Sequence, residues 1–260
     1  SMLLSYSQIN KAQNEIGLSL RPYQIPNGDN DDKSVTLDEL AVEAKNQGLL
    51  SYHRPNGSIE LLKTFIANDI PVVVRTLLNA NDDIGHYRLV RGFDEQLQVV
   101  IQDDSLQGAD IKIPYTEFEK MWEVFSFEFL VAVPNEKKNQ TEEILGNNLD
   151  INIAWTNALL KNRELLSQNP DNIYYKFNLS VALSNLGRHE EAVKEFEEIE
   201  NRLSFRTLWY QIEPIESYYA LENYNRVFEI TDKIINNQNR AYSELYLLRG
   251  NVYKKQGNVQ

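Results

Sequence analysis

Two short β-rich runs with a polar break between them decide the fold of the first half of the chain. The first run reads Gly85-His86-Tyr87-Arg88-Leu89-Val90-Arg91-Gly92-Phe93-Asp94, and the second begins at Leu97 and closes in Gln102-Asp103-Asp104-Ser105. Both runs are rich in residues that favour strands, and Asp94-Glu95-Gln96 separates them. The sequence therefore predicts a β-hairpin with strands over 86–93 and 97–103.

The register of this hairpin decides which acid meets His86. A two- or four-residue turn centred on Asp94-Glu95 places His86 directly opposite Asp103, with their Cβ atoms about 5 Å apart. A three-residue turn instead brings Asp104 opposite His86. A carboxylate beside an imidazole fixes its tautomer and stabilises the imidazolium, as a general base for a nucleophile requires. A histidine that pairs with an acid only for stability would give the same pattern.

Helix and strand signals surround the hairpin. Thr36 and Glu39 form a capping box for a helix that Gly48 ends, Ser58 can cap a second helix, and Pro71 blocks further helix. The expected elements are helices over 36–48, 59–68 and 116–122, and strands over 72–74 and 127–133. This order predicts an α+β domain with a mostly antiparallel sheet that ends near Pro134.

The second half of the chain is predicted to be helical and repetitive. Residues 135–140 are polar and linker-like, and strand signals stop beyond them. The stretch Leu186–Ala192 aligns with Leu221–Val227 at a shift of 35, and Tyr253–Asn258 restarts the pattern. Pro214 falls inside an expected helix, where it should kink the helix or mark a break. The pattern resembles the tetratricopeptide repeat over residues 140–260, with a last repeat that we expect to be incomplete at the C-terminus.

Length and composition set limits on the whole chain. Its 260 residues are enough for two domains, and we expect them at 1–134 and 140–260. With 26 Lys plus Arg against 38 Asp plus Glu, a nucleic-acid partner bound through its phosphates is not expected. No apolar run is long enough for a membrane span. The absence of cysteine excludes disulfides and thiolate metal sites within these residues.

The remaining candidate residues do not indicate a second functional site. The acidic run 29–33 lacks the glycine and the glutamate of a calcium loop, and the sequence contains neither a phosphate-binding glycine loop nor a paired-histidine zinc motif. We therefore expect no cofactor. His53 is interpreted as a loop or groove-rim residue, and His189 as a solvated residue in a turn of the repeats. Six tyrosines of the second half could line a peptide-binding groove, although packing between helices is the simpler role: Tyr174, Tyr175, Tyr210, Tyr218, Tyr219 and Tyr224.

Beyond these patterns, the stretch from Val35 to Val133 resembles a family of bacterial papain-like cysteine peptidases of the bacteriocin (double-glycine) leader-processing type. The resemblance rests on five motifs in order: Asp69–Val74, Gly85-His86-Tyr87, Gly92-Phe93-Asp94, Gln102-Asp103, and Phe118 followed by Trp122. One departure is Asp104, which stands where the family commonly has proline.

The resemblance implies a cysteine-type hydrolase that cleaves peptide bonds. It implies His86 as general base and then acid, Asp103 as its orienting carboxylate, and a nucleophilic Cys in a Cys-Gly-Pro setting. In the family that Cys precedes a segment like residues 1–6, so we expect it upstream of Ser1 and the chain as given to be inactive. The alternative is a catalytically dead peptidase-like fold that acts as a peptide-binding scaffold. The compartment stays open, since both a cytoplasmic and an exported protein fit.

Overall fold

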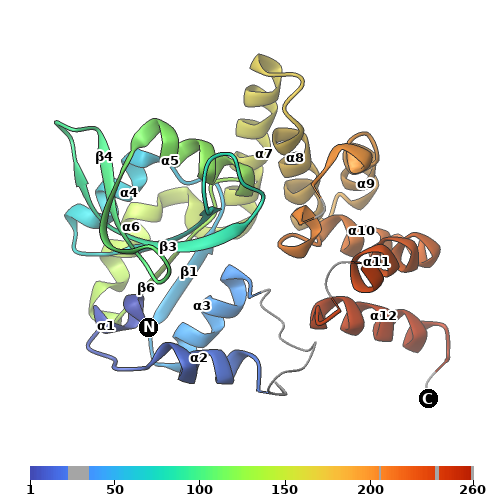
Figure 1. The fold of residues 1–260 in the computed structure, drawn as a ribbon, viewed down its shortest axis with the longest axis horizontal. Coiled ribbons are helices and arrows are strands. Elements are labelled where there is room, and N and C mark those ends of the chain that lie inside the picture. Colours follow the sequence, from blue (N-terminus) through green and yellow to red (C-terminus); the bar gives the residue numbers. More distant parts are fainter. Residues whose placement is uncertain (23–34, 205, 238–239, 259–260) are drawn as a thin grey trace.

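The computed structural model describes residues 1–22, 35–204, 206–237 and 240–258 (Figure 1). The acidic run 29–33 lies outside these residues. The strands are β1 (Leu50–Arg54), β2 (Val72–Leu77), β3 (Gly85–Asp94), β4 (Val99–Asp104), β5 (Gly108–Pro114) and β6 (Phe129–Val133). The α-helices are α1 (Met2–Ser5), α2 (Gln13–Leu20), α3 (Leu37–Asn46), α4 (Ile59–Ala67), α5 (Tyr115–Trp122), α6 (Lys138–Leu145), α7 (Ile151–Gln168), α8 (Ile173–Asn185), α9 (His189–Glu197), α10 (Glu213–Ala220), α11 (Tyr224–Asn237) and α12 (Ser243–Lys255). Short 3-10 helices are η1 (Glu123–Phe125), η2 (Asn135–Lys137), η3 (Gly146–Leu149), η4 (Glu200–Arg202) and η5 (Thr207–Trp209).

The first half is a six-stranded sheet with helices on both faces. The strand order is β1-β6-β2-β3-β4-β5, and all neighbouring strands are antiparallel, as predicted. Strand β6 is buried along its whole length because its side chains alternate between two cores. Phe129 and Val131 pack in the core shared with α4 and α5, whereas Leu130 and Ala132 face α1 and α3. The sheet is therefore the middle of three layers.

The local helix signals of the sequence are confirmed. The Thr36 side chain accepts the Glu39 N–H and Glu39 reaches back to the Thr36 N–H, so both halves of the capping box form. Ser58 caps α4 by accepting the Leu61 N–H. The short helix predicted at 116–122 is α5, whose buried face includes Trp122. These signals succeed because each depends on residues only three or four positions apart.

The predicted register of the β3–β4 hairpin is wrong. The turn spans the four residues Glu95–Gln98, because the Asp94 carboxylate accepts the N–H groups of Gln96 and Leu97 and so ends β3 one residue later than expected. A bulge between Val90 and Gly92 then shifts the pairing back by one residue, which leaves most of the displacement in place. As a result Leu89, and not His86, lies opposite Asp103.

The stretch 135–140 is not a linker in its local structure. It forms η2 and the start of α6, and Leu145 at the end of α6 belongs to the same core as Phe129. The core of the sheet thus includes chain beyond Pro134. The domain boundary expected there stays a prediction.

The second half is entirely helical in its described residues and has its own apolar core, and its helices form a curved row beside the sheet (Figure 1). Its helix pairs share one backbone geometry at a spacing of 35. Gly187, Glu222 and Gly257 all adopt a left-handed φ, at 71°, 58° and 77°. The next residue in each case donates its N–H to the carbonyl five positions earlier, with 2.9 Å between N and O: Arg188 to Leu183, Asn223 to Tyr218, and Asn258 to Tyr253. Pro214 stands in the first turn of α10, so it marks a break before the helix and does not kink it.

Candidate functional site

His86 is the second residue of β3 and has one of its two ring nitrogens occupied. Its Nε2 lies 2.8 Å from Oδ2 of Asp104, and the imidazole is 18% exposed. Its Nδ1 has no hydrogen-bond partner within the described part of the chain. A histidine held at one nitrogen and open at the other has the arrangement that proton transfer requires.

Asp104 is fixed in place by its own turn. Its Oδ1 accepts the N–H groups of Leu106 at 2.7 Å and Gln107 at 3.0 Å, and its carboxylate is fully buried. Burial alone would raise the pKa of Asp104, but the hydrogen bonds from the Gln107 N–H and from His86 outweigh burial and lower that pKa. The ionised carboxylate therefore accepts the Nε2–H of His86, which leaves the lone pair on Nδ1.

The expected contact between His86 and Asp103 does not form. Asp103 pairs with Arg91, at 2.8 Å between Oδ2 and Nε, and also accepts the Asp110 N–H. Continuing the observed register by one residue places Arg88 opposite Asp104, so His86 and Asp104 are diagonal neighbours on one face of the hairpin. Successive strand residues point to opposite faces, which is why adjacent acids take different partners.

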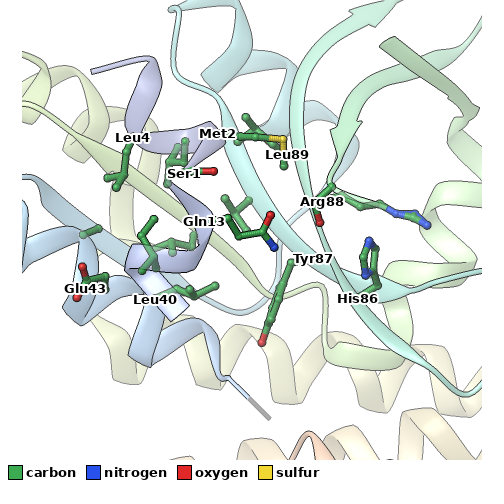
Figure 2. A pocket seen from close by; sticks show the side chains of 16 residues that line it. Ser1, Met2, Leu4, Gln13, Leu40, Glu43, His86, Tyr87, Arg88 and Leu89 are labelled. Carbon is green, nitrogen blue, oxygen red and sulfur yellow. The ribbon is translucent and has the colours of Figure 1, made fainter. Parts of the chain in front are cut away.

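A cavity of about 360 Å³ lies beside His86, between the sheet and the N-terminal helices (Figure 2). Most of its wall is apolar and comes from α1, α3 and the central strands. In Figure 2, Ser1 and Gln13 lie on the side of the N-terminal helices and His86 and Arg88 lie along β3, whereas Met2 lies against Leu89. Ser1 and His86 thus line the same cavity, although 85 positions separate them in the sequence. The wall residues with polar side chains are Ser1, Gln13, Glu43, His86, Tyr87, Arg88 and Ser105.

His53 is chemically different from His86, because both of its ring nitrogens meet carboxylates. Nδ1 lies 2.8 Å from Oδ1 of Asp38, and Nε2 lies 3.1 Å from Oε2 of Glu128. Burial alone would lower the pKa of His53, but the hydrogen bonds to Asp38 and Glu128 outweigh burial and raise that pKa to about 9. His53 is therefore a partly buried imidazolium that joins α3, β1 and the residue before β6. The interpretation of His53 as a rim residue missed this role.

His189 also has a defined contact. It opens α9, is half-buried, and its Nδ1 lies 3.2 Å from the Ser217 hydroxyl in α10. The expectation of a solvated turn residue is wrong, because α10 packs beside the start of α9. Tyr218, Tyr219 and Tyr224 pack in the helical core, as in the simpler interpretation, whereas Tyr174 and Tyr210 pack against the core of the sheet. Among the described residues, no group of three or more histidines and acids could hold a metal ion, and no helix is long and apolar enough to cross a bilayer.

The sequence contains a signal for Asp104 but none for the contacts that hold it. The alternative three-residue turn already placed Asp104 near His86. The Asx turn at Asp94 and the bulge after Val90 could not be predicted from strand propensities, since both depend on packing in the finished sheet.

Comparison with known proteins gives a family match for the sheet half of the chain. No curated protein matches the chain. A solved structure described as a C39-like peptidase, from Bacillus anthracis, is similar at 19% identity and a TM-score of 0.41, and the match covers 52% of this chain and 85% of that one. The model of the Peptidase_C39 like family matches residues 1–129. The antiparallel sheet with its helices is consistent with a C39-like fold, and the family match indicates a peptidase-like domain within residues 1–129.

Proposed function

We propose that residues 1–134 form a cysteine peptidase-like domain in which His86 transfers protons and Asp104 orients it. The observation that carries this proposal is the 2.8 Å contact between His86 Nε2 and Asp104 Oδ2, with Nδ1 unpaired in the described residues and His86 on the wall of a cavity. A fixed carboxylate on one ring nitrogen leaves the other free to take a proton from a nucleophile. In this proposal Asp104, and not Asp103, orients His86, because Asp103 pairs with Arg91.

The reaction would be acyl transfer through a thiolate. The cysteine thiol gives its proton to Nδ1 of His86, and the thiolate attacks the carbonyl carbon of the peptide bond. The imidazolium then donates that proton to the departing amine, which leaves an acyl-thioester. Water, deprotonated by His86, cleaves the thioester, releases the carboxylate product and restores the thiol. Asp104 keeps its charge throughout and stabilises the imidazolium.

The nucleophile would be a cysteine upstream of Ser1, since residues 1–260 contain none. The position of Ser1 supports this proposal, because Ser1 lines the same cavity as His86. In a longer protein, the residues directly before Ser1 would therefore lie at or near that cavity. The 260 residues alone would be inactive, because the proposed mechanism has no nucleophile among them.

For the helical half we propose a tetratricopeptide-repeat array that recruits a peptide or protein. The recurrence of one turn geometry at Gly187, Glu222 and Gly257 supports a repeated helix pair of 35 residues. Stacked helix pairs of this kind form extended surfaces for partners. Recruitment would bring the substrate, or an assembly partner, close to the peptidase-like domain.

The competing proposal is a scaffold that keeps the cavity for binding and lacks catalysis. Intact-mass spectrometry of a longer protein treated with a thiol alkylator distinguishes the two. Fast labelling at a single cysteine that slows sharply in His86→Ala would support the peptidase. His189→Ala is the matched control, because this histidine lies in the helical half, and it should leave the labelling rate unchanged. A labelling rate that does not depend on His86, or the lack of any upstream cysteine, would favour the scaffold.

A further inference from the structure

A short segment of the helical half contacts the hairpin that carries His86. This clamp segment, residues 206–211, lies just before α10, and the curved row of helices brings it against the sheet (Figure 1). It touches β2, the β2–β3 loop and the residue before β6. Its polar contacts with the sheet half include Arg206 Nη1 to Asp83 Oδ1 at 2.5 Å, the Arg75 guanidinium to the Tyr210 carbonyl, and Gln211 Nε2 to Glu128 Oε1 at 3.0 Å.

A packing contact joins Tyr210 and Gly85, the residue directly before His86. A Cβ atom placed on Gly85 would lie only 3.1 Å from Cζ and 3.2 Å from Cδ1 and Cδ2 of the Tyr210 ring. The ring therefore lies against the bare backbone at the first residue of β3, a position that a larger residue would crowd. Burial raises the pKa of Tyr210. The Tyr210 ring thus packs directly against Gly85.

The sheet fixes Tyr210 from its other side. The Arg75 guanidinium lies 4.9 Å from the Phe125 ring centroid and 5.5 Å from the Tyr210 ring centroid. The two rings meet edge-on, with centroids 6.1 Å apart. Arg75 is buried on β2, and the next residue of β2, Thr76, is the direct partner of His86. Tyr210 is therefore packed against the two strands that meet at His86.

We infer that Tyr210 is a positioning residue for His86: by pressing on Gly85 it fixes the start of β3 and so holds the imidazole on Asp104. The inference rests on the proposed role of His86 in catalysis, and it names how the helical half would regulate that site. A partner that moves the clamp segment would loosen the His86–Asp104 contact. A small displacement is sufficient, because acid–base catalysis depends on hydrogen-bond distances between fixed groups.

Imidazole NMR of the 260-residue protein tests the inference without any catalytic readout. The chain has three histidines, and His53 and His189 act as internal references. In the unaltered protein we expect a downfield, exchange-protected Nε2–H signal from His86. Tyr210→Ala should remove that signal and shift the ring nitrogens of His86, whereas Tyr210→Phe, which keeps the ring, should largely restore both. A merely stabilising role of Tyr210 would lower the melting temperature without changing the His86 signals.

Two further variants keep the test decisive. Gly85→Ala changes the other partner of this contact, because the added methyl group pushes the Tyr210 ring away from β3. It should therefore also remove the Nε2–H signal, and it provides the test if Tyr210→Ala does not fold. Tyr224→Ala is the matched control, since that tyrosine stacks on Tyr219 within the helical half and should leave His86 unchanged. Unaltered His86 signals in folded Tyr210→Ala or Gly85→Ala would overturn the inference. Failure of the proposed peptidase would appear separately, as labelling of the longer protein that is independent of His86.

Discussion

His86 and Asp104 are diagonal neighbours on β3 and β4, and 2.8 Å separates Nε2 from Oδ2. The carboxylate is completely buried, whereas the imidazole is 18% exposed, so the pair has a fixed inner member and an accessible outer one. A general base requires this arrangement, in which a fixed carboxylate orients an accessible imidazole. The carboxylate restricts the ring from behind, and the exposed side is left for the reacting group.

The first prediction separates the two adjacent acids. In a longer protein with an activated cysteine, Asp104→Asn should slow thiol alkylation and peptide cleavage about 100-fold or more, because an amide neither fixes the tautomer nor stabilises the imidazolium. Asp103→Asn should leave both rates nearly unchanged, since Asp103 pairs with Arg91. The measurements are alkylation rates by intact mass and kcat/KM on a peptide. Equal losses in the two variants would contradict the assignment of Asp104.

The second prediction concerns the pH dependence of stability around His53. Its folded pKa is raised to about 9, from 6.5. The stabilising contribution is therefore complete below pH 6.5 and is lost as the pH rises through about 9. The shift corresponds to about 3 kcal/mol of unfolding free energy. At acidic pH, Asp38 matters as well. Its hydrogen bond with His53 lowers the pKa of Asp38, so the stabilising contribution of Asp38 is lost only as the pH falls through that lowered pKa.

Urea denaturation at a series of pH values measures this dependence. His53→Gln should lower the unfolding free energy near pH 6.5 and flatten its decline toward pH 9. His189→Gln should preserve the slope, because the His189 ring contacts the uncharged hydroxyl of Ser217, at 3.2 Å, and not a carboxylate. A His53→Gln protein with the slope of the unaltered chain would show that His53 is not the imidazolium described here.

The third prediction is a gain in stability from Glu213→Gln. Burial, followed by the charges of Glu128 and Glu216, raises the pKa of Glu213 to about 8. Its Oε2 is buried without a hydrogen-bond partner in the described residues. The folded state therefore binds this proton more tightly than the unfolded chain, so the unfolding free energy falls as the pH rises from 4.5 to about 8.

Glutamine has nearly the same shape and cannot ionise. Glu213→Gln should therefore raise the unfolding free energy above pH 8 relative to the unaltered protein, and make little difference near pH 4. Glu190→Gln, an exposed change in α9, is the matched control and should not raise the unfolding free energy above pH 8. If Glu213→Gln destabilises the protein at alkaline pH, the carboxylate has a favourable partner and the prediction is wrong.

The sequence predicts what is local, and fails where a contact depends on the finished sheet. The Thr36–Glu39 capping box and the Ser58 cap are encoded within one helical turn, and both form. The hairpin strands were also predicted, but a strand pattern of period two does not reveal a bulge, and one bulge changes every later partner.

Long-range contacts show the same limit at the site itself. Tyr210 meets Gly85 across 125 positions of sequence, and no periodicity connects a tyrosine of the helical half to a strand start. The residues next to His53 in the sequence contain no pattern that indicates its role. Its two carboxylates come from α3 and from the residue before β6, so only the fold brings them together.

The fourth prediction compares two glycines. A Cβ atom on Gly57 would lie 2.4 Å from the Trp122 ring and 2.9 Å from the Phe127 carbonyl oxygen, so Gly57→Ala should destabilise the protein by about 1–3 kcal/mol. Gly17 lies within α2 with nothing within 4 Å of the same position, so Gly17→Ala should stabilise by up to about 1 kcal/mol. Denaturant midpoints measure both. Equal effects would contradict the tight packing of Trp122 on Gly57.

The fifth prediction tests whether three helix-pair turns, spaced 35 residues apart, are structurally equivalent. Glu222 adopts a φ of 58° at the position where the turns before and after it have Gly187 and Gly257. A left-handed φ costs a residue with a side chain about 1 kcal/mol, whereas glycine adopts it without strain. Glu222→Gly should therefore raise the unfolding free energy by up to about 1 kcal/mol, and Gly187→Ala should lower it by a similar amount.

The exposed position of Glu222 makes the comparison direct. The ion pair of Glu222 with Lys255, at 3.7 Å, is on the surface and contributes little to stability. Glu222→Ala is the matched control, because it removes the same charge while keeping a Cβ atom, so only the glycine variant should stabilise. If Glu222→Gly and Glu222→Ala change the unfolding free energy equally, the left-handed turn is not strained at this position. The turn at Glu222 would then not be equivalent to the glycine turns 35 residues before and after it.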